Sequence, residues 1–181
     1  MQIKPLLIEF MNMIRFGNVD VYNEFSLQHE LGIFLRTKVD NSYKIQFERN
    51  VKYFNITNTI KHEIDLVIYC ENKRYAIELK YPRNGQVPEQ MFACLKDICF
   101  MEQLKNRGFK STYCITLVDD KIFYSGSKQD EIYAYFRGNK PIHGFVTKPT
   151  GKKDAIVEIG GTYKVNWEVC GDNRRYYIIE I

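Results

Sequence analysis

Three charged side chains interrupt two apolar stretches of this chain of 181 residues. Asp65 lies in the run His-Glu-Ile-Asp-Leu-Val-Ile-Tyr-Cys (62–70), and Glu78 and Lys80 lie in Arg-Tyr-Ala-Ile-Glu-Leu-Lys (74–80). Because burying unpaired charge is costly, charges inside apolar strands indicate a use for them. Two carboxylates can hold a divalent cation and a neighbouring lysine can position water, which is the chemistry of metal-dependent phosphodiester hydrolysis.

The two apolar runs are expected to form a β-hairpin, since polar residues separate them and asparagine tolerates the positive φ of a tight turn. With Asn72 and Lys73 as the turn, Asp65 would oppose Lys80 and Val67 would oppose Glu78. Alternation then places Asp65, Glu78 and Lys80 on one face, near enough for the two carboxylates to share one ion. The other face is almost wholly apolar and is expected in the core: Ile64, Leu66, Ile68, Tyr75, Ile77 and Leu79.

Asp65 followed by Glu78-Leu79-Lys80 resembles the pattern of the PD-(D/E)xK nuclease superfamily, to which many restriction endonucleases and resolvases belong. Ile64 stands where the signature proline of the family would precede the aspartate. The resemblance covers roughly residues 24–120, whose expected elements run helix, three antiparallel strands, helix, strand. It implies a restriction-endonuclease-like α/β fold: a mixed sheet with helices on both faces, here with an added C-terminal β-hairpin.

The resemblance also implies an activity, that of a metal-dependent nuclease acting on nucleic-acid phosphodiester bonds. DNA is the favoured substrate, and endonuclease and exonuclease action both stay open. Asp65, Glu78 and the backbone carbonyl of Leu79 would hold Mg²⁺ or Mn²⁺, which retains several waters and needs few protein ligands. Lys80 would orient or help deprotonate the attacking water and balance charge in the transition state.

A third carboxylate is expected from a helix that runs from about Glu24 to Arg36. On a helical wheel Glu30 lies about 60° from Leu27 and ~40° from Phe34, at the edge of the buried stripe. In the resembled family a first-helix glutamate often supports the metal, directly or through water, and Glu30 is taken as its match. Glu24 projects to a similar face and is the competitor, although the helix dipole alone also favours a first-turn glutamate.

Contacts to nucleic acid are expected near the same site, because phosphate contacts supply most non-specific affinity. Arg83 follows Lys80 by three residues and precedes a helix N-terminus, a combination suited to phosphate. Gln90 lies in the first turn of that helix and could face the metal site. A plain connecting loop is the competing interpretation of this segment. Three lysines from a later segment complete the expected set: Lys148, Lys152 and Lys153.

Composition favours one soluble domain over residues 1–181, with a core at about 24–120 and a C-terminal extension at about 137–181. The chain is 45% hydrophobic and 14% aromatic, which is enough for a core. Five scattered cysteines without C-x-x-C spacing read as reduced core thiols, and the N-terminus lacks a signal-peptide layout. We therefore expect a cytoplasmic protein without a membrane partner; a homodimer stays open. The net charge of +4 permits nucleic-acid binding without arguing strongly for it.

The remaining elements follow from apolar periodicity and turn residues. Helices are expected over residues 3–14, from Pro88 toward Gly108, and over a short stretch at 129–136. Strands are expected at 43–54 and 111–118, the latter parallel to part of the sheet. Residues 137–153 are rich in Gly, Pro and Lys and read as a long loop. Residues 163–170 and 175–181 are expected to form the C-terminal hairpin.

Two other classes of function compete with the nuclease. The protein could be a non-catalytic nucleic-acid-binding module that keeps the fold, or a protein-interaction domain with a fortuitous triad. In a purely structural interpretation, Asp65 and Lys80 form a cross-strand ion pair at the surface that contributes little to stability. Against it, the same face also carries Val67, Tyr69 and Ala76, which are not typical of a solvated surface.

Overall fold

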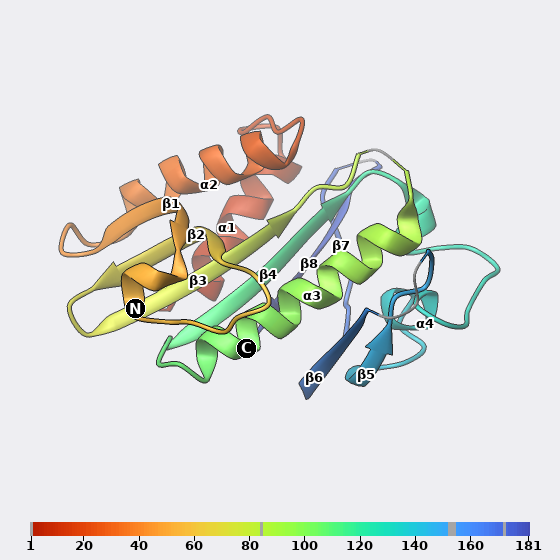
Figure 1. Ribbon diagram of the computed structural model, residues 1–181. Helices are drawn as coiled ribbons and strands as arrows, with labels where there is room; N and C mark the ends of the chain where they lie inside the picture. The colour runs from red at the N-terminus through yellow and green to blue at the C-terminus, as the bar shows by residue number, and fades with distance from the viewer. Residues whose placement is uncertain (1, 84, 152–154, 172) are drawn as a thin grey trace.

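The computed structural model describes residues 2–83, 85–151, 155–171 and 173–181. Its helices and strands follow one another along the chain as Figure 1 labels them. In chain order they are α1 (Lys4–Arg15), α2 (Glu24–Lys38), β1 (Lys44–Asn50), the 3₁₀ turn η1 (Val51–Phe54), β2 (Glu63–Cys70), β3 (Lys73–Lys80), α3 (Val87–Lys105), β4 (Ser111–Val118), the 3₁₀ turn η2 (Lys121–Phe123), α4 (Tyr133–Phe136), β5 (Ile142–Thr147), β6 (Ile156–Tyr163), β7 (Glu168–Val169) and β8 (Arg175–Glu180).

The expected α/β class with a mixed sheet is confirmed. Within the described residues, the main sheet has the strand order β1-β2-β3-β4-β8-β7, and β5 and β6 form a second, two-stranded sheet. β3 and β4 are parallel, and the other neighbours in the main sheet are antiparallel. Parallel neighbours need a crossover, and α3 supplies it between β3 and β4.

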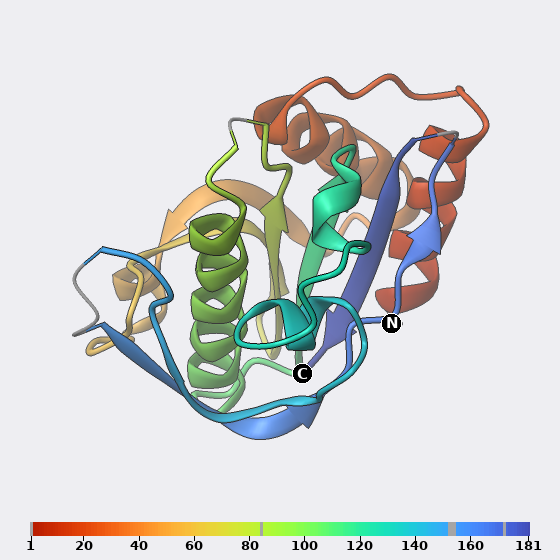
Figure 2. The same cartoon turned by 90° about the vertical axis from the view of Figure 1, so that its right-hand side faces the viewer.

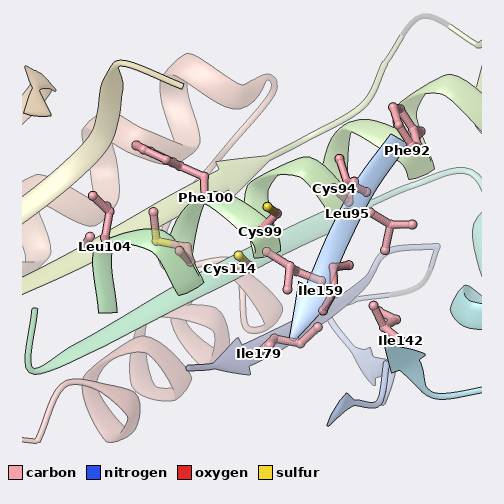
Figure 3. Packing of buried hydrophobic residues seen from close by; sticks show 14 of the residues in the cluster. Phe92, Cys94, Leu95, Cys99, Phe100, Leu104, Cys114, Ile142, Ile159 and Ile179 are labelled. Carbon is pink, nitrogen blue, oxygen red and sulfur yellow. The ribbon is translucent and has the colours of Figure 1, made fainter. Parts of the chain in front are cut away.

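Helices cover both faces of the main sheet, as expected. One apolar cluster joins α1 and α2 to the sheet, and a second joins α3 to its opposite face. The β5–β6 sheet lies beside α3, below the helix in Figure 1 and Figure 2, and contacts it through β6. Figure 3 shows that side chains of α3, β4, β5, β6 and β8 meet in the second cluster, among them Leu95, Cys114, Ile142, Ile159 and Ile179. Because α3 is covered on two sides, its apolar residues extend around most of its surface.

The apolar face of the β2–β3 pair is confirmed with one exception. Leu66, Ile68, Tyr75, Ile77 and Leu79 are buried in the cluster with α1 and α2. Ile64 is also buried, but it belongs to the cluster under α3. The sheet is distorted beside it: the ladder pairs residues 47 with 66 and 49 with 64, while residue 48 between them takes a φ of 47°.

The expected register of the hairpin is wrong by one turn position. The turn consists of Glu71 and Asn72, and the ladder pairs Leu66 with Ile77 and Cys70 with Lys73. The register carried one step further places Asp65 opposite Glu78 rather than opposite Lys80. The residue opposite each position changes by two, which is one full repeat of the pleat. The residues expected on each face of the pair therefore still lie on that face.

The C-terminal third departs most from expectation. Residues 137–153 are not one long loop, because β5 lies within them and pairs with β6. Its Gly and Lys content concealed the alternation of Ile142 and Val146, which are buried together with Val157 and Ile159 of β6. The C-terminal hairpin is present as β7 and β8, although β7 has only two residues, and β8 also joins the main sheet beside β4.

None of the helices in the described part of the chain combines the length and hydrophobicity needed to cross a lipid bilayer. The five cysteines form no disulfide with one another, and four of them are buried.

Candidate functional site

The β2–β3 pair places two carboxylates side by side where its ladder ends. The Leu79 backbone N–H donates to Asp65 Oδ2 at 2.8 Å, and the Asp65 backbone N–H donates to Glu78 Oε1 at 3.2 Å. Each carboxylate thus accepts a hydrogen bond from the backbone of the opposite strand. Carboxylates held by backbone donors have a defined orientation, which a metal site requires.

A side chain of α2 holds the backbone of Asp65 in place. Gln28 is buried, and its Nε2 donates to the Asp65 carbonyl and to Glu48 Oε1, both at 2.6 Å. Glu48 has the positive φ that interrupts the β1–β2 ladder opposite Asp65. A side chain therefore satisfies a backbone carbonyl in this gap, and strain of this kind often accompanies functional sites.

The N-terminus of α2 brings a third carboxylate to Lys80. Asn23 and Ser26 form a capping box, which starts the helix at Glu24. Glu24 Oε1 accepts from Lys80 Nζ at 3.1 Å, and its Oε2 accepts from the Tyr81 backbone N–H at 3.0 Å. The first helical residue of α2 is thereby tied to the end of β3.

The structure brings Glu24, and not Glu30, to this position. Glu30 lies on the outer part of α2, with Oε1 3.9 Å from His29 Nδ1 and its side chain 37% exposed. The wheel angle placed Glu30 at the edge of the buried stripe correctly. It missed that β3 ends near the first turn of α2, which only the helix-to-sheet packing determines.

Two further charged residues belong to the site and were not predicted. Lys61 Nζ, from the segment before β2, donates to Glu78 Oε2 and, at 2.9 Å, to Asp97 Oδ1. Asp97 is buried in the middle of α3, and its Oδ2 lies 3.6 Å from Lys80 Nζ. A signal for Asp97 existed: it follows Cys94 by three residues and precedes Met101 by four, on a buried helical face. We call the six residues the charged cluster: Glu24, Lys61, Asp65, Glu78, Lys80 and Asp97.

Burial dominates the ionisation of the two strand carboxylates. Desolvation raises the pKa of Asp65 to about 6, against the opposing effects of Lys61, the Leu79 N–H and Lys80. Glu78 is almost fully buried, and desolvation with the negative charge of Asp65 and Asp97 raises its pKa well above the usual value. Both carboxylates therefore hold a proton more tightly than they would in water, despite the lysines beside them.

Both lysines of the charged cluster are held as ammonium ions. Burial favours the neutral amine of Lys80, but the carboxylates of Asp97, Glu24, Asp65 and Glu78 outweigh it and raise its pKa. The pKa of Lys61 is raised in the same way against its burial, chiefly by Glu78 and Asp97. Lys80 is thus suited to orient water or neutralise developing charge rather than to remove a proton.

The donor set fits a divalent cation held by few protein ligands. Four carboxylates face two ammonium groups, a formal excess of two negative charges. Asp97 Oδ2 is buried without a hydrogen-bond partner in the structure as described. Over the described ranges, however, no three carboxylate, imidazole or thiol side chains converge as a metal-binding group. A divalent cation bound here would have Asp65 and Glu78 as its carboxylate ligands and water at its other positions, a ligand set that Mg²⁺ accepts.

The other expected ligand atoms and nucleic-acid contacts have varied positions. The Leu79 carbonyl accepts from Lys80 Nζ at 3.2 Å. Arg83 pairs with Asp119 and donates to the Tyr81 hydroxyl at 3.0 Å. Gln90 is half-buried in the first turn of α3. Lys148 lies just after β5, in a segment that contacts α3 through Thr150 and Glu89. Lys152 and Lys153 lie outside the described residues.

No protein-family model, curated protein or solved structure matches this chain. The geometry of the charged cluster and the topology around it are therefore the grounds for a functional proposal.

Proposed function

We propose that the protein is a metal-dependent nuclease with a restriction-endonuclease-like fold. The observation that carries the proposal is the pairing of Asp65 and Glu78 at the end of the β2–β3 ladder, with the Lys80 ammonium on the same face. Two oriented carboxylates suit a divalent cation, which prefers oxygen ligands, and the ammonium group suits the negative charge of a phosphate.

The arrangement of elements supports the same proposal. α2 precedes three antiparallel strands, and α3 then leads to β4, which lies parallel to β3. This is the element order of the PD-(D/E)xK core that the motif resembles. Asp65, Glu78 and Lys80 occupy the second and third strands of that series, as the motif requires.

The roles of the residues follow from their environments. Asp65 and Glu78, with the Leu79 carbonyl, would hold Mg²⁺ or Mn²⁺. When bound, such an ion polarises a phosphoryl oxygen and lowers the pKa of water. The Lys80 ammonium, fixed by Glu24 and Asp97, would orient the attacking water and neutralise charge on the phosphoryl oxygens. Glu24 replaces Glu30 as the helical glutamate nearest to this chemistry.

One observation favours a second candidate, a non-catalytic domain that retains the fold. Glu78 and Asp97 already share the Lys61 ammonium, so their charge is partly compensated without any metal. In that case the cluster would be a structural ion network, whose net contribution to stability is small. The two candidates differ in one measurable property, the binding of a divalent cation by Asp65 and Glu78.

The test is cleavage of defined substrates under controlled metal conditions. Supercoiled, linear, single-stranded and branched DNA, and RNA, are incubated with the protein in Mg²⁺, Mn²⁺ or EDTA. We expect phosphodiester cleavage of DNA with either metal, none in EDTA, and none with Asp65→Asn. Glu63→Gln is the matched control, because Glu63 lies two residues away on the same strand and is exposed. If no substrate is cut and calorimetry detects no Mn²⁺ binding, the non-catalytic candidate replaces the nuclease.

A further inference from the structure

The ammonium group of Lys61 lies in the charged cluster beside two carboxylates. Its Nζ contacts Glu78 Oε2 and Asp97 Oδ1, and it lies 5.7 Å from the centre of the Phe100 ring. The side chain is 26% exposed, whereas the side chain of Glu78 is 1% exposed. The most buried carboxylate of the cluster therefore has an ammonium ion, rather than a neutral donor, on its second oxygen.

The backbone that carries Lys61 is attached to α3 and η1. The Ile60 N–H donates to Gln103 Oε1 at 2.8 Å, and Arg107 Nη2 donates to the Asn58 carbonyl at 3.2 Å. On the other side the Val51 N–H donates to the His62 carbonyl at 2.8 Å. Lys61 can therefore leave the carboxylates by rotation of its long side chain, with its backbone held in place.

We propose that Lys61 is an intramolecular counter-ion that competes with the divalent cation for Glu78, so that its side chain must withdraw when the cation binds. This inference rests on the proposed function, because it assumes that Asp65 and Glu78 hold the cation. An ammonium and a divalent ion at one carboxylate oxygen repel each other strongly in a half-buried site. Lys61 would thus keep the carboxylates paired before metal arrives and would limit the affinity for metal.

The experiment compares Mn²⁺ binding by calorimetry in variants of the full chain. We expect Lys61→Met to bind Mn²⁺ about tenfold more tightly or more, since one unit of positive charge beside the ligands is removed. Lys61→Arg keeps the charge and should bind no more tightly than the wild type. Lys73→Met makes the same change of net charge at the exposed end of the hairpin and should leave the affinity unchanged.

Thermal unfolding provides a readout that is independent of activity. In EDTA, Lys61→Met should unfold at a lower temperature than the wild type, because Glu78 and Asp97 lose their counter-ion. Saturating Mn²⁺ should then raise the midpoint of Lys61→Met by more than that of the wild type. If Lys61→Met does not fold without metal, Lys61→Gln is used with the same expectations, as it keeps a donor and removes the charge.

The outcomes separate this inference from the proposed function. If the wild type binds Mn²⁺ and Lys61→Met binds no more tightly, Lys61 is not a competing counter-ion, while the metal site stands. If only Lys61→Met binds Mn²⁺, the competition is supported in its strongest form. If neither protein binds Mn²⁺ at millimolar concentrations, the metal site itself is absent and both proposals fall.

Discussion

The β2–β3 pair buries two faces of opposite chemistry. Toward α1 and α2 it presents five buried apolar side chains, and Val67 and Ala76 join the apolar core on the side of α3. That second face also carries Asp65, Glu78 and Lys80, which meet Lys61 and Asp97 there. Apart from Ile64, alternation along the same two strands thus divides the pair into a face that packs and a face that concentrates charge.

The two faces contribute differently to the free energy of folding. Full burial of a large aliphatic side chain stabilises the fold by roughly 1.5–3 kcal/mol, without any requirement for a charged partner. Desolvating charges is unfavourable, and ion pairs in such places often contribute little net stability. The raised pKa values of Asp65 and Glu78 record this desolvation. We infer that the packed face stabilises the sheet that holds the charged face in place.

The largest expected effect is on catalysis and comes from the charged face. Glu78→Gln or Asp65→Asn should lower cleavage by about 10³-fold or more, because a metal supplies several kcal/mol of transition-state stabilisation. Both variants should keep the native circular dichroism spectrum and lose Mn²⁺ binding in calorimetry. Lys80→Met should lose cleavage but largely keep Mn²⁺ binding. Wild-type cleavage by Glu78→Gln would disprove the assigned role of the charged face.

The next largest effect is on stability and comes from the apolar face. Ile77 is fully buried, so Ile77→Ala should lower the free energy of unfolding by about 2–5 kcal/mol, through lost burial and a residual cavity. Urea denaturation followed by fluorescence measures this change. Ile33→Ala on the exposed side of α2 is the control, with an expected change within about 1 kcal/mol. A small effect at Ile77 would mean that burial of the apolar face is not what stabilises the sheet under the charged face.

The dependence of stability on pH tests the charged face more finely. The pKa of Asp65 is about 6 in the folded state and lower in the unfolded state. Between about pH 4 and 6, Asp65 is therefore protonated to a greater extent in the folded protein than in the unfolded chain. The free energy of unfolding in EDTA should therefore fall as the pH rises through this window. Above the window, Asp65 should cause no further decrease. Asp65→Asn should remove this contribution, which changes the free energy of unfolding by on the order of 1–3 kcal/mol between pH 4 and 7.

Urea titrations of both proteins at several pH values measure the difference. Glu63→Gln serves again as the control, since Glu63 is exposed and lies outside the charged cluster. Parallel slopes for the wild type and Asp65→Asn would show that Asp65 has the same pKa in the folded and unfolded states. Desolvation would then not outweigh the lysines and the Leu79 N–H at this carboxylate.

Local pattern predicted much of the fold. The strands around Asp65 and Glu78, the helix after Pro88 and the parallel strand β4 all follow from periodicity, proline positions and apolar runs. The strand β5 did not, because its glycine and lysine content resembles a loop. Its partner β6 lies far from the motif in the sequence and packs on α3, which no local signal reveals.

The site was predictable only where its residues share one hairpin. Asp65, Glu78 and Lys80 lie on two adjacent strands, so alternation alone places them together, even with the turn assigned one residue late. Lys61, Asp97 and Glu24 come from a loop and two helices, and their meeting depends on how those elements pack. The choice of Glu30 over Glu24 shows the limit of a helical wheel, which gives the direction of a side chain but not the position of the helix.

The smallest expected effect concerns Arg83, which lies at the edge of the packed face. Its guanidinium is 5.1 Å from the ring centre of Tyr81, a residue of the cluster with α1 and α2, and it also pairs with Asp119. Because Asp119 already neutralises it, Arg83→Ala should weaken binding of non-cleavable DNA only a few-fold and lower the salt slope by about one at most. Asp119→Asn frees the guanidinium and should strengthen binding. Fluorescence anisotropy at several salt concentrations measures both changes. Unchanged affinity and salt slope in both variants would assign Arg83 to the packed face and leave phosphate contacts to other residues.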